Sequence, residues 1–67
     1  MTYLYRYPTD GGGYDWVTLT GVTLFTLGPD RVLRHADGQV VVTDVDLAQA
    51  YRTLRQLGHT MDQIPAP

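Results

Sequence analysis

Few side chains in this 67-residue sequence could carry acid–base or metal chemistry. His35 and His59 are the only histidines, and aspartates lie near them at Asp37 and Asp62. A histidine beside a carboxylate can act as a general base or as a metal ligand. Nothing in the sequence fixes a partner beside either ring, so we interpret both as solvated surface histidines. We therefore predict no catalytic residue and no metal site.

Two further carboxylates, Asp44 and Asp46, flank Val45 and could together bind a cation or transfer a proton. The residues around them favour a structural interpretation. Thr43 fits as the N-cap of a helix with Asp46 three residues later, as in a capping box, and Asp44 is a competing cap. We expect these side chains to begin a helix.

Nucleophilic chemistry has little support, because the chain contains neither cysteine nor serine. The absence of cysteine also excludes disulfides and thiolate zinc sites. Arg52 and Arg55 form a polar helix face that could contact phosphates, although a solvated face is the simpler interpretation. We expect a protein that is not an enzyme and binds no cofactor.

The net charge of −2 combines five arginines with seven aspartates, without lysine or glutamate. This balance gives no electrostatic footprint for nucleic acid. No apolar run approaches the roughly 18 residues of a membrane span, and the N-terminus lacks a signal peptide's order, so we expect a cytoplasmic protein without membrane contact. A domain this small buries little surface and is marginally stable. Small domains gain stability from disulfides, metals or association, and for this chain self-association is the remaining means.

The elements that must position these residues follow from hydrophobic periodicity. Alternating strand formers and turn residues predict five strands, and a helical spacing of apolar residues follows them. The strands cover about 2–7, 14–20, 22–27, 31–36 and 39–43, the helix covers 45–57, and the tail 59–67 is irregular. The predicted fold is a single α+β domain over 1–67, with an antiparallel sheet of four or five strands, flat or curled into a small barrel, and one C-terminal helix.

Three consecutive glycines at 11–13 could suggest a phosphate-binding loop. Such loops lead into a helix and usually carry a lysine, whereas these glycines lead into a strand. Asp10 and Asp15 flank them with negative charge. We interpret the segment as a hairpin turn. A second hairpin is predicted at Asp37-Gly38, with a type I′ turn.

A symmetric glycine loop would pair Tyr7 with Tyr14 and Tyr5 with Trp16, and would set Arg6 opposite Asp15 as a cross-strand ion pair. A tight turn at 20–21 would then place Trp16 opposite Phe25. This register gathers six aromatic residues on one face of the sheet: Tyr3, Tyr5, Tyr7, Tyr14, Trp16 and Phe25. The other face would be mostly aliphatic.

One helix can cover only one face of such a sheet, so the aromatic face either stays exposed or becomes the core of a closed barrel. If it is exposed, its tyrosines and tryptophan are typical of protein interfaces. We hypothesise a non-enzymatic interaction protein that binds another protein, or a second copy as a homodimer, through these six residues. Its size is typical of inhibitors and adaptors, including those of phages and mobile elements. The alternative is a small nucleic-acid-binding module that stacks bases on the aromatic face, against which the acidic charge balance argues.

Overall fold

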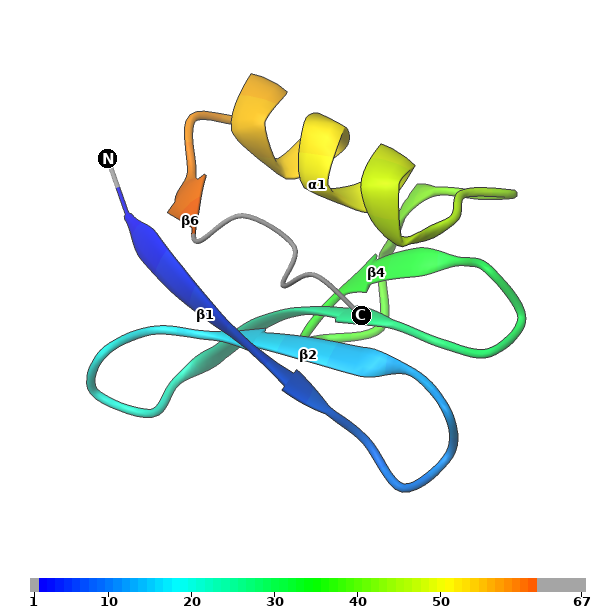
Figure 1. The fold of residues 1–67 in the computed structure, drawn as a ribbon, viewed down its shortest axis with the longest axis horizontal. Coiled ribbons are helices and arrows are strands. Elements are labelled where there is room, and N and C mark those ends of the chain that lie inside the picture. The colour runs from blue at the N-terminus through cyan, green and yellow to red at the C-terminus, as the bar shows by residue number, and fades with distance from the viewer. Residues whose placement is uncertain (1, 62–67) are drawn as a thin grey trace.

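A single curled sheet with one helix packed against it makes up the protein (Figure 1), seen in a computed structural model that describes residues 2–61. The elements in chain order are β1 (Tyr3–Pro8), β2 (Tyr14–Val17), β3 (Thr23–Leu27), β4 (Leu33–His35), β5 (Val40–Val42), α1 (Leu47–Gln56) and β6 (Thr60–Met61). The strand order across the sheet is β5-β4-β3-β2-β1-β6. Strands β1 to β5 form an antiparallel meander, whereas β6 pairs with β1 in parallel.

The predicted α+β class is therefore confirmed, with a sixth strand that the sequence did not suggest. After α1, the chain returns to the open edge of β1, where the backbone N–H of Thr60 donates to the carbonyl of Thr2 at 3.0 Å. The two residues of β6 lie in the predicted irregular tail, so that expectation is wrong for Thr60–Met61. The remainder of the tail, 62–67, lies outside the described residues.

All four hairpins of the meander use the same three-residue loop. Two backbone hydrogen bonds close each loop. The N–H of the third loop residue donates to the carbonyl of the residue that precedes the loop. The N–H of that preceding residue donates to the carbonyl of the residue that follows the loop. The third loop residue has a positive φ each time, and these residues are Gly12, Gly21, Arg31 and Gly38. This pattern is a type I turn followed by a left-handed residue. The hairpin at Asp37-Gly38 is confirmed, but its predicted type I′ turn is wrong because Asp37 has no positive φ.

The three-residue loop after Thr9 changes the register of β1 on β2. Its closing pair joins Thr9 to Gly13, so Arg6 lies opposite Trp16 and Tyr7 opposite Asp15. The predicted pairing of Tyr7 with Tyr14 is wrong by one residue. A shift of one residue moves every side chain of a strand to the other face relative to its neighbour.

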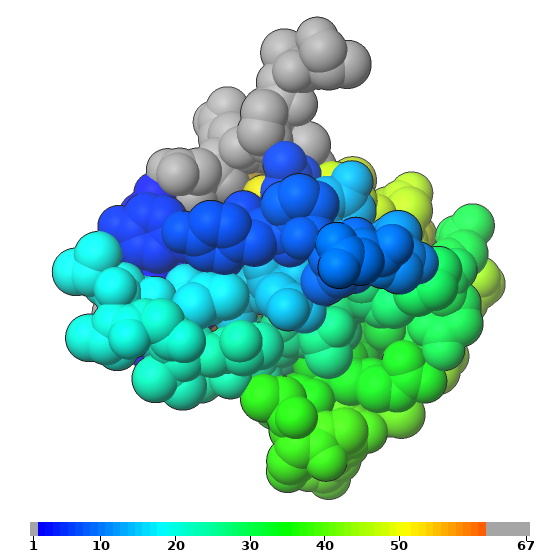
Figure 2. All heavy atoms as spheres, turned by 90° about the horizontal axis from the view of Figure 1, so that it is seen from below, coloured from blue at the N-terminus to red at the C-terminus, as the bar shows by residue number. Residues whose placement is uncertain are grey.

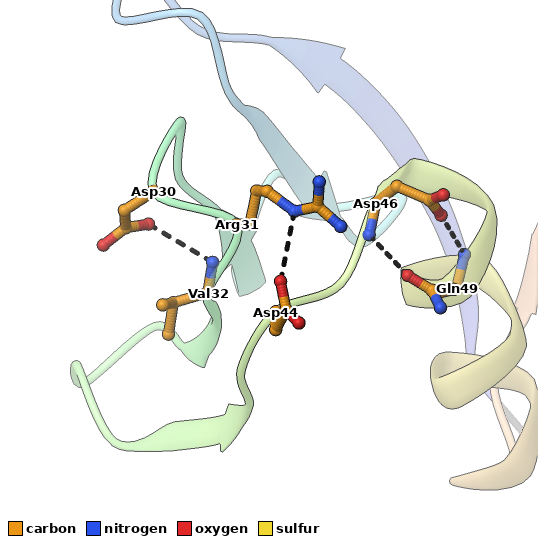
Figure 3. Close-up of polar contacts among 6 residues, drawn as sticks. All are labelled: Asp30, Arg31, Val32, Asp44, Asp46 and Gln49. Carbon is orange, nitrogen blue, oxygen red and sulfur yellow. Dashed lines mark hydrogen bonds and ion pairs between the residues drawn. The ribbon is translucent and has the colours of Figure 1, made fainter.

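Helix α1 begins and ends with well-formed caps. Asp46 is the N-cap: its carboxylate accepts the backbone N–H of Gln49 at 2.8 Å, and the Gln49 side chain accepts the N–H of Asp46 at 2.9 Å (Figure 3). The predicted N-cap, Thr43, lies three residues too early. At the other end, the N–H of Gly58 donates to the carbonyl of Arg55 and that of His59 to Leu54, which is a Schellman motif.

The helix packs on one side of the sheet, which we call the inner face, and leaves the outer face uncovered (Figure 1). Trp16 on β2 is fully buried on the inner face, and its ring meets Tyr51 of α1 edge-on at 5.9 Å. The core consists of Leu4, Trp16, Phe25, Leu27, Leu33, Val45, Ala50, Tyr51 and Leu54. Among the described residues, no helix is long and apolar enough to cross a membrane.

Candidate protein-binding surface

Three tyrosines of β1 form a row on the outer face, which we call the tyrosine row: Tyr3, Tyr5 and Tyr7. They alternate with the buried Leu4 along the strand, so they point away from the helix. Tyr3 and Tyr7 remain 38% and 56% exposed, and the rings of Tyr3 and Tyr5 lie 4.9 Å apart. Figure 2 views the molecule from the side opposite the helix, with β1 in dark blue and the hairpins that follow in lighter blue and cyan.

A carboxylate lies directly beside this row. Asp15 of β2 is paired with Tyr7 on one side and with Thr26 of β3 on the other. Its neighbour in the chain, Trp16, is buried on the inner face, so Asp15 points outward. Within the described residues, Asp15 makes no ion pair and no side-chain hydrogen bond. The sequence-based expectation of an Arg6–Asp15 pair is wrong, because the register places these two side chains on opposite faces.

The other three aromatic residues of the predicted surface lie on the inner face. Trp16 is fully buried, Phe25 is 4% exposed, and Tyr14 is half-buried against the core. The grouping of six aromatics on one face is therefore wrong. Trp16 and Phe25 are core residues beneath the helix, whereas on the outer face Tyr3 and Tyr7 are exposed and Tyr5 is half-buried.

Arg6 is also on the inner face, where it lies over aromatic rings. Its guanidinium carbon is 4.9 Å from the centre of the Tyr14 ring and 5.9 Å from that of Tyr51. Both distances are within the range of a cation–π interaction. This stacking, in place of the predicted ion pair, holds a half-buried arginine at the edge of the core.

The two histidines lie on either side of one core ring. His35 stacks against Phe25 with ring centres 5.1 Å apart, and His59 meets the same ring edge-on at 5.1 Å. Both are half-buried, so the expectation of two solvated surface histidines is wrong. The Nδ1 atom of His59 and the Nε1 atom of Trp16 are buried without a hydrogen-bond partner in the described part of the chain. No group of three or more potential metal ligands occurs there either.

The glycine stretch acts as a turn. Gly12 supplies the positive φ of the loop, and a Cβ on Gly13 would overlap the carbonyl oxygen of Leu27 on β3. Gly11 has open space around it. These glycines therefore shape a hairpin and bring it close to β3, and their amides do not begin a helix.

The remaining arginines of the sheet region are engaged with carboxylates near the β3–β4 turn. Arg34 bonds to Asp30 at 2.9 Å. Arg31 lies 3.6 Å from Asp44 (Figure 3). The hydrogen bond from Arg34 lowers the pKa of Asp30, and the backbone N–H of Val32 and the charge of Arg34 add to this effect. These ion pairs are exposed, so they contribute little to stability.

No family model, curated protein sequence or solved structure matches this chain. The candidate surface therefore depends on geometry alone: the tyrosine row, with Asp15 beside it, on the face of the sheet that the helix leaves open.

Proposed function

We propose that this chain is a protein-binding module that contacts its partner through the tyrosine row. One observation carries the proposal: Tyr3 and Tyr7 are exposed and Tyr5 is half-buried, whereas Trp16, Phe25 and Tyr51 are buried between the helix and the curled sheet. Tyrosine is enriched where proteins bind one another, because its rigid ring buries a large area and its hydroxyl can remain hydrated.

The surroundings of the row support a protein partner over nucleic acid. An aromatic platform for bases needs cations nearby to hold the phosphate backbone. Here the charged residue paired with the row across the strands is Asp15, and the one arginine of β1, Arg6, lies on the inner face. A protein interface built on tyrosines needs no such cations.

The test removes the rings without disturbing the core. In the double variant Tyr5→Thr/Tyr7→Thr, threonine keeps the strand propensity while the aromatic surface is lost. Val40→Thr is the matched control, because Val40 is 52% exposed on β5 at the far end of the sheet. Wild type, the double variant and Val40→Thr each serve as bait in affinity capture, and the captured proteins are quantified by mass spectrometry. Sedimentation velocity across micromolar concentrations measures whether each protein binds a second copy of itself.

We expect the double variant to lose at least one association that wild type and Val40→Thr both retain, with a melting temperature close to that of wild type. Association that persists in the double variant, or the absence of any association in the wild type, would contradict the proposal. A double variant that unfolds would show that the tyrosines stabilise the fold instead of binding a partner.

A further inference from the structure

We infer that the tyrosine row and Asp15 together receive an arginine side chain from a basic segment of the partner protein. This inference rests on the proposed function and specifies the chemistry of the partner. It starts from two facts that belong to the same patch: an outward carboxylate, Asp15, without a partner in the described part of the chain, and the exposed ring of Tyr7 directly opposite it.

The register places these groups at the distance that an arginine can bridge. Tyr7 and Asp15 are directly opposite on neighbouring strands, and side chains in such positions start about 5 Å apart. A guanidinium that stacks on a tyrosine ring lies parallel to the ring, and its N–H groups point outward in the guanidinium plane. From there it can donate two hydrogen bonds to a carboxylate, the strongest geometry for this pair.

The molecule already contains half of this arrangement on its inner face. Arg6 lies 4.9 Å from the Tyr14 ring and 5.9 Å from the Tyr51 ring. The outer face offers the same kind of ring with a carboxylate added. Among the described residues Asp15 makes no ion pair, and Arg34, two strands away on the same face, is engaged by Asp30.

Charge also argues for a basic segment over a second copy docked face to face. A two-fold pairing of the tyrosine row would bring two Asp15 carboxylates onto one small interface, where like charges repel. Asp10, at the tip of the same hairpin, is exposed and has no ion pair in the described part of the chain, so it adds negative potential beside the row.

The experiment uses the full chain and a ten-residue peptide of alternating glycine and arginine, followed by NMR. The control peptide carries citrulline in place of arginine, which keeps the shape and removes the charge. We expect the arginine peptide to shift the amide signals of Tyr5, Tyr7 and Asp15 with saturation, and the citrulline peptide to leave them unchanged. Asp15→Asn should weaken binding about tenfold, since the carboxylate loses its charge-assisted hydrogen bonds.

Asp37→Asn is the matched variant. It removes the same charge from an exposed turn, and the asparagine oxygen can still accept the backbone N–H of Gln39. Its affinity for the arginine peptide should equal that of wild type. If Asp15→Asn and Asp37→Asn weaken binding of the arginine peptide equally, the effect comes from the net charge of the protein alone, and the inference is overturned. Signal shifts that map elsewhere, or no binding at all, would overturn it as well.

The two proposals fail in different ways. If Asp15→Asn retains a captured partner that Tyr5→Thr/Tyr7→Thr loses, the tyrosine row binds proteins, but the inference that the partner presents a basic segment to Asp15 is wrong. If sedimentation shows that the partner lost by both variants is a second copy, the row is an interface between copies, and the inference of a separate basic partner is wrong. If Tyr5→Thr/Tyr7→Thr loses no association, the proposed function itself fails.

Discussion

At the scale of single residues, the two sides of β1 and β2 have opposite roles. Trp16 is fully enclosed by the sheet and Tyr51, although its indole N–H has no acceptor among the described residues. A buried donor without a partner reduces the benefit of burial but does not cancel the large apolar area of the ring. Tyr7, three positions along β1 from the core residue Leu4 and on the opposite face, has more than half its surface exposed. Burial therefore separates the aromatic residues of the core from the tyrosines of the outer face.

Trp16→Ala should unfold the protein or come close to it. Truncating a buried tryptophan costs about 3–5 kcal/mol, against the roughly 5–15 kcal/mol that holds an ordinary domain together. Tyr7→Ala is the comparison and should leave the melting temperature within a few degrees of wild type. Chemical denaturation followed by far-UV circular dichroism measures both, and a stable Trp16→Ala chain would contradict the observed core.

At the scale of elements, one turn geometry is repeated through the meander, and local sequence explains most of it. Three of the four left-handed loop positions are glycine, and the fourth is Arg31, with a φ of 66°. The carbonyl of Arg31 accepts the N–H of Val45 at 3.0 Å, so the β3–β4 turn also holds the segment that leads into α1. That segment then ends at the cap formed by Asp46 and Gln49.

The glycine loop provides a test at this scale. Gly11→Ala should be neutral or stabilise by up to about 1 kcal/mol, because the site is open and alanine restricts the unfolded chain. Gly13→Ala should destabilise, since its Cβ would overlap the backbone of Leu27 and force β2 away from β3. Thermal unfolding of the two variants measures the difference, and equal melting temperatures would show that β3 does not approach the loop closely.

At the scale of the whole molecule, stability depends on the contact between α1 and the inner face. Leu54 of the helix and Leu4 of β1 are both fully buried in one core cluster. The chain after the helix returns to β1 as β6, so the helix connects the two edges of the sheet. Losing this contact would expose the core and free the parallel edge together.

Leu54→Ala should therefore cost about 2–5 kcal/mol, the usual range for a buried leucine. Gln56→Ala, on the exposed side of the same helix, should change stability by no more than about half a kcal/mol. Differential scanning calorimetry compares the two. An unchanged melting temperature in Leu54→Ala would mean that α1 does not contribute to the core.

Local sequence was sufficient to predict the α+β class, the turns at 11–13, 20–21 and 37–38, and the approximate span of the helix. These features depend on periodicity, turn residues and caps that act within a few positions of one another. The pairing of Trp16 with Phe25 was also predicted correctly, and the structure confirms it. Gly58, which directly follows the last apolar residue of the helical pattern, ends the helix with a positive φ.

Only the tertiary structure decided which side of β1 faces the helix. Strict alternation in this strand fits either face, and the register depends on whether the loop closes at Thr9 or one residue earlier. That single step moves Tyr5 and Tyr7 away from Trp16, and it leaves Asp15 beside the tyrosines without Arg6. Strand β6 was also beyond local reasoning, because two residues carry no periodicity and pair only with an edge that the fold supplies. The candidate surface is thus a consequence of register, because three consecutive glycines leave the residue at which the loop closes undetermined, and only the folded sheet shows it.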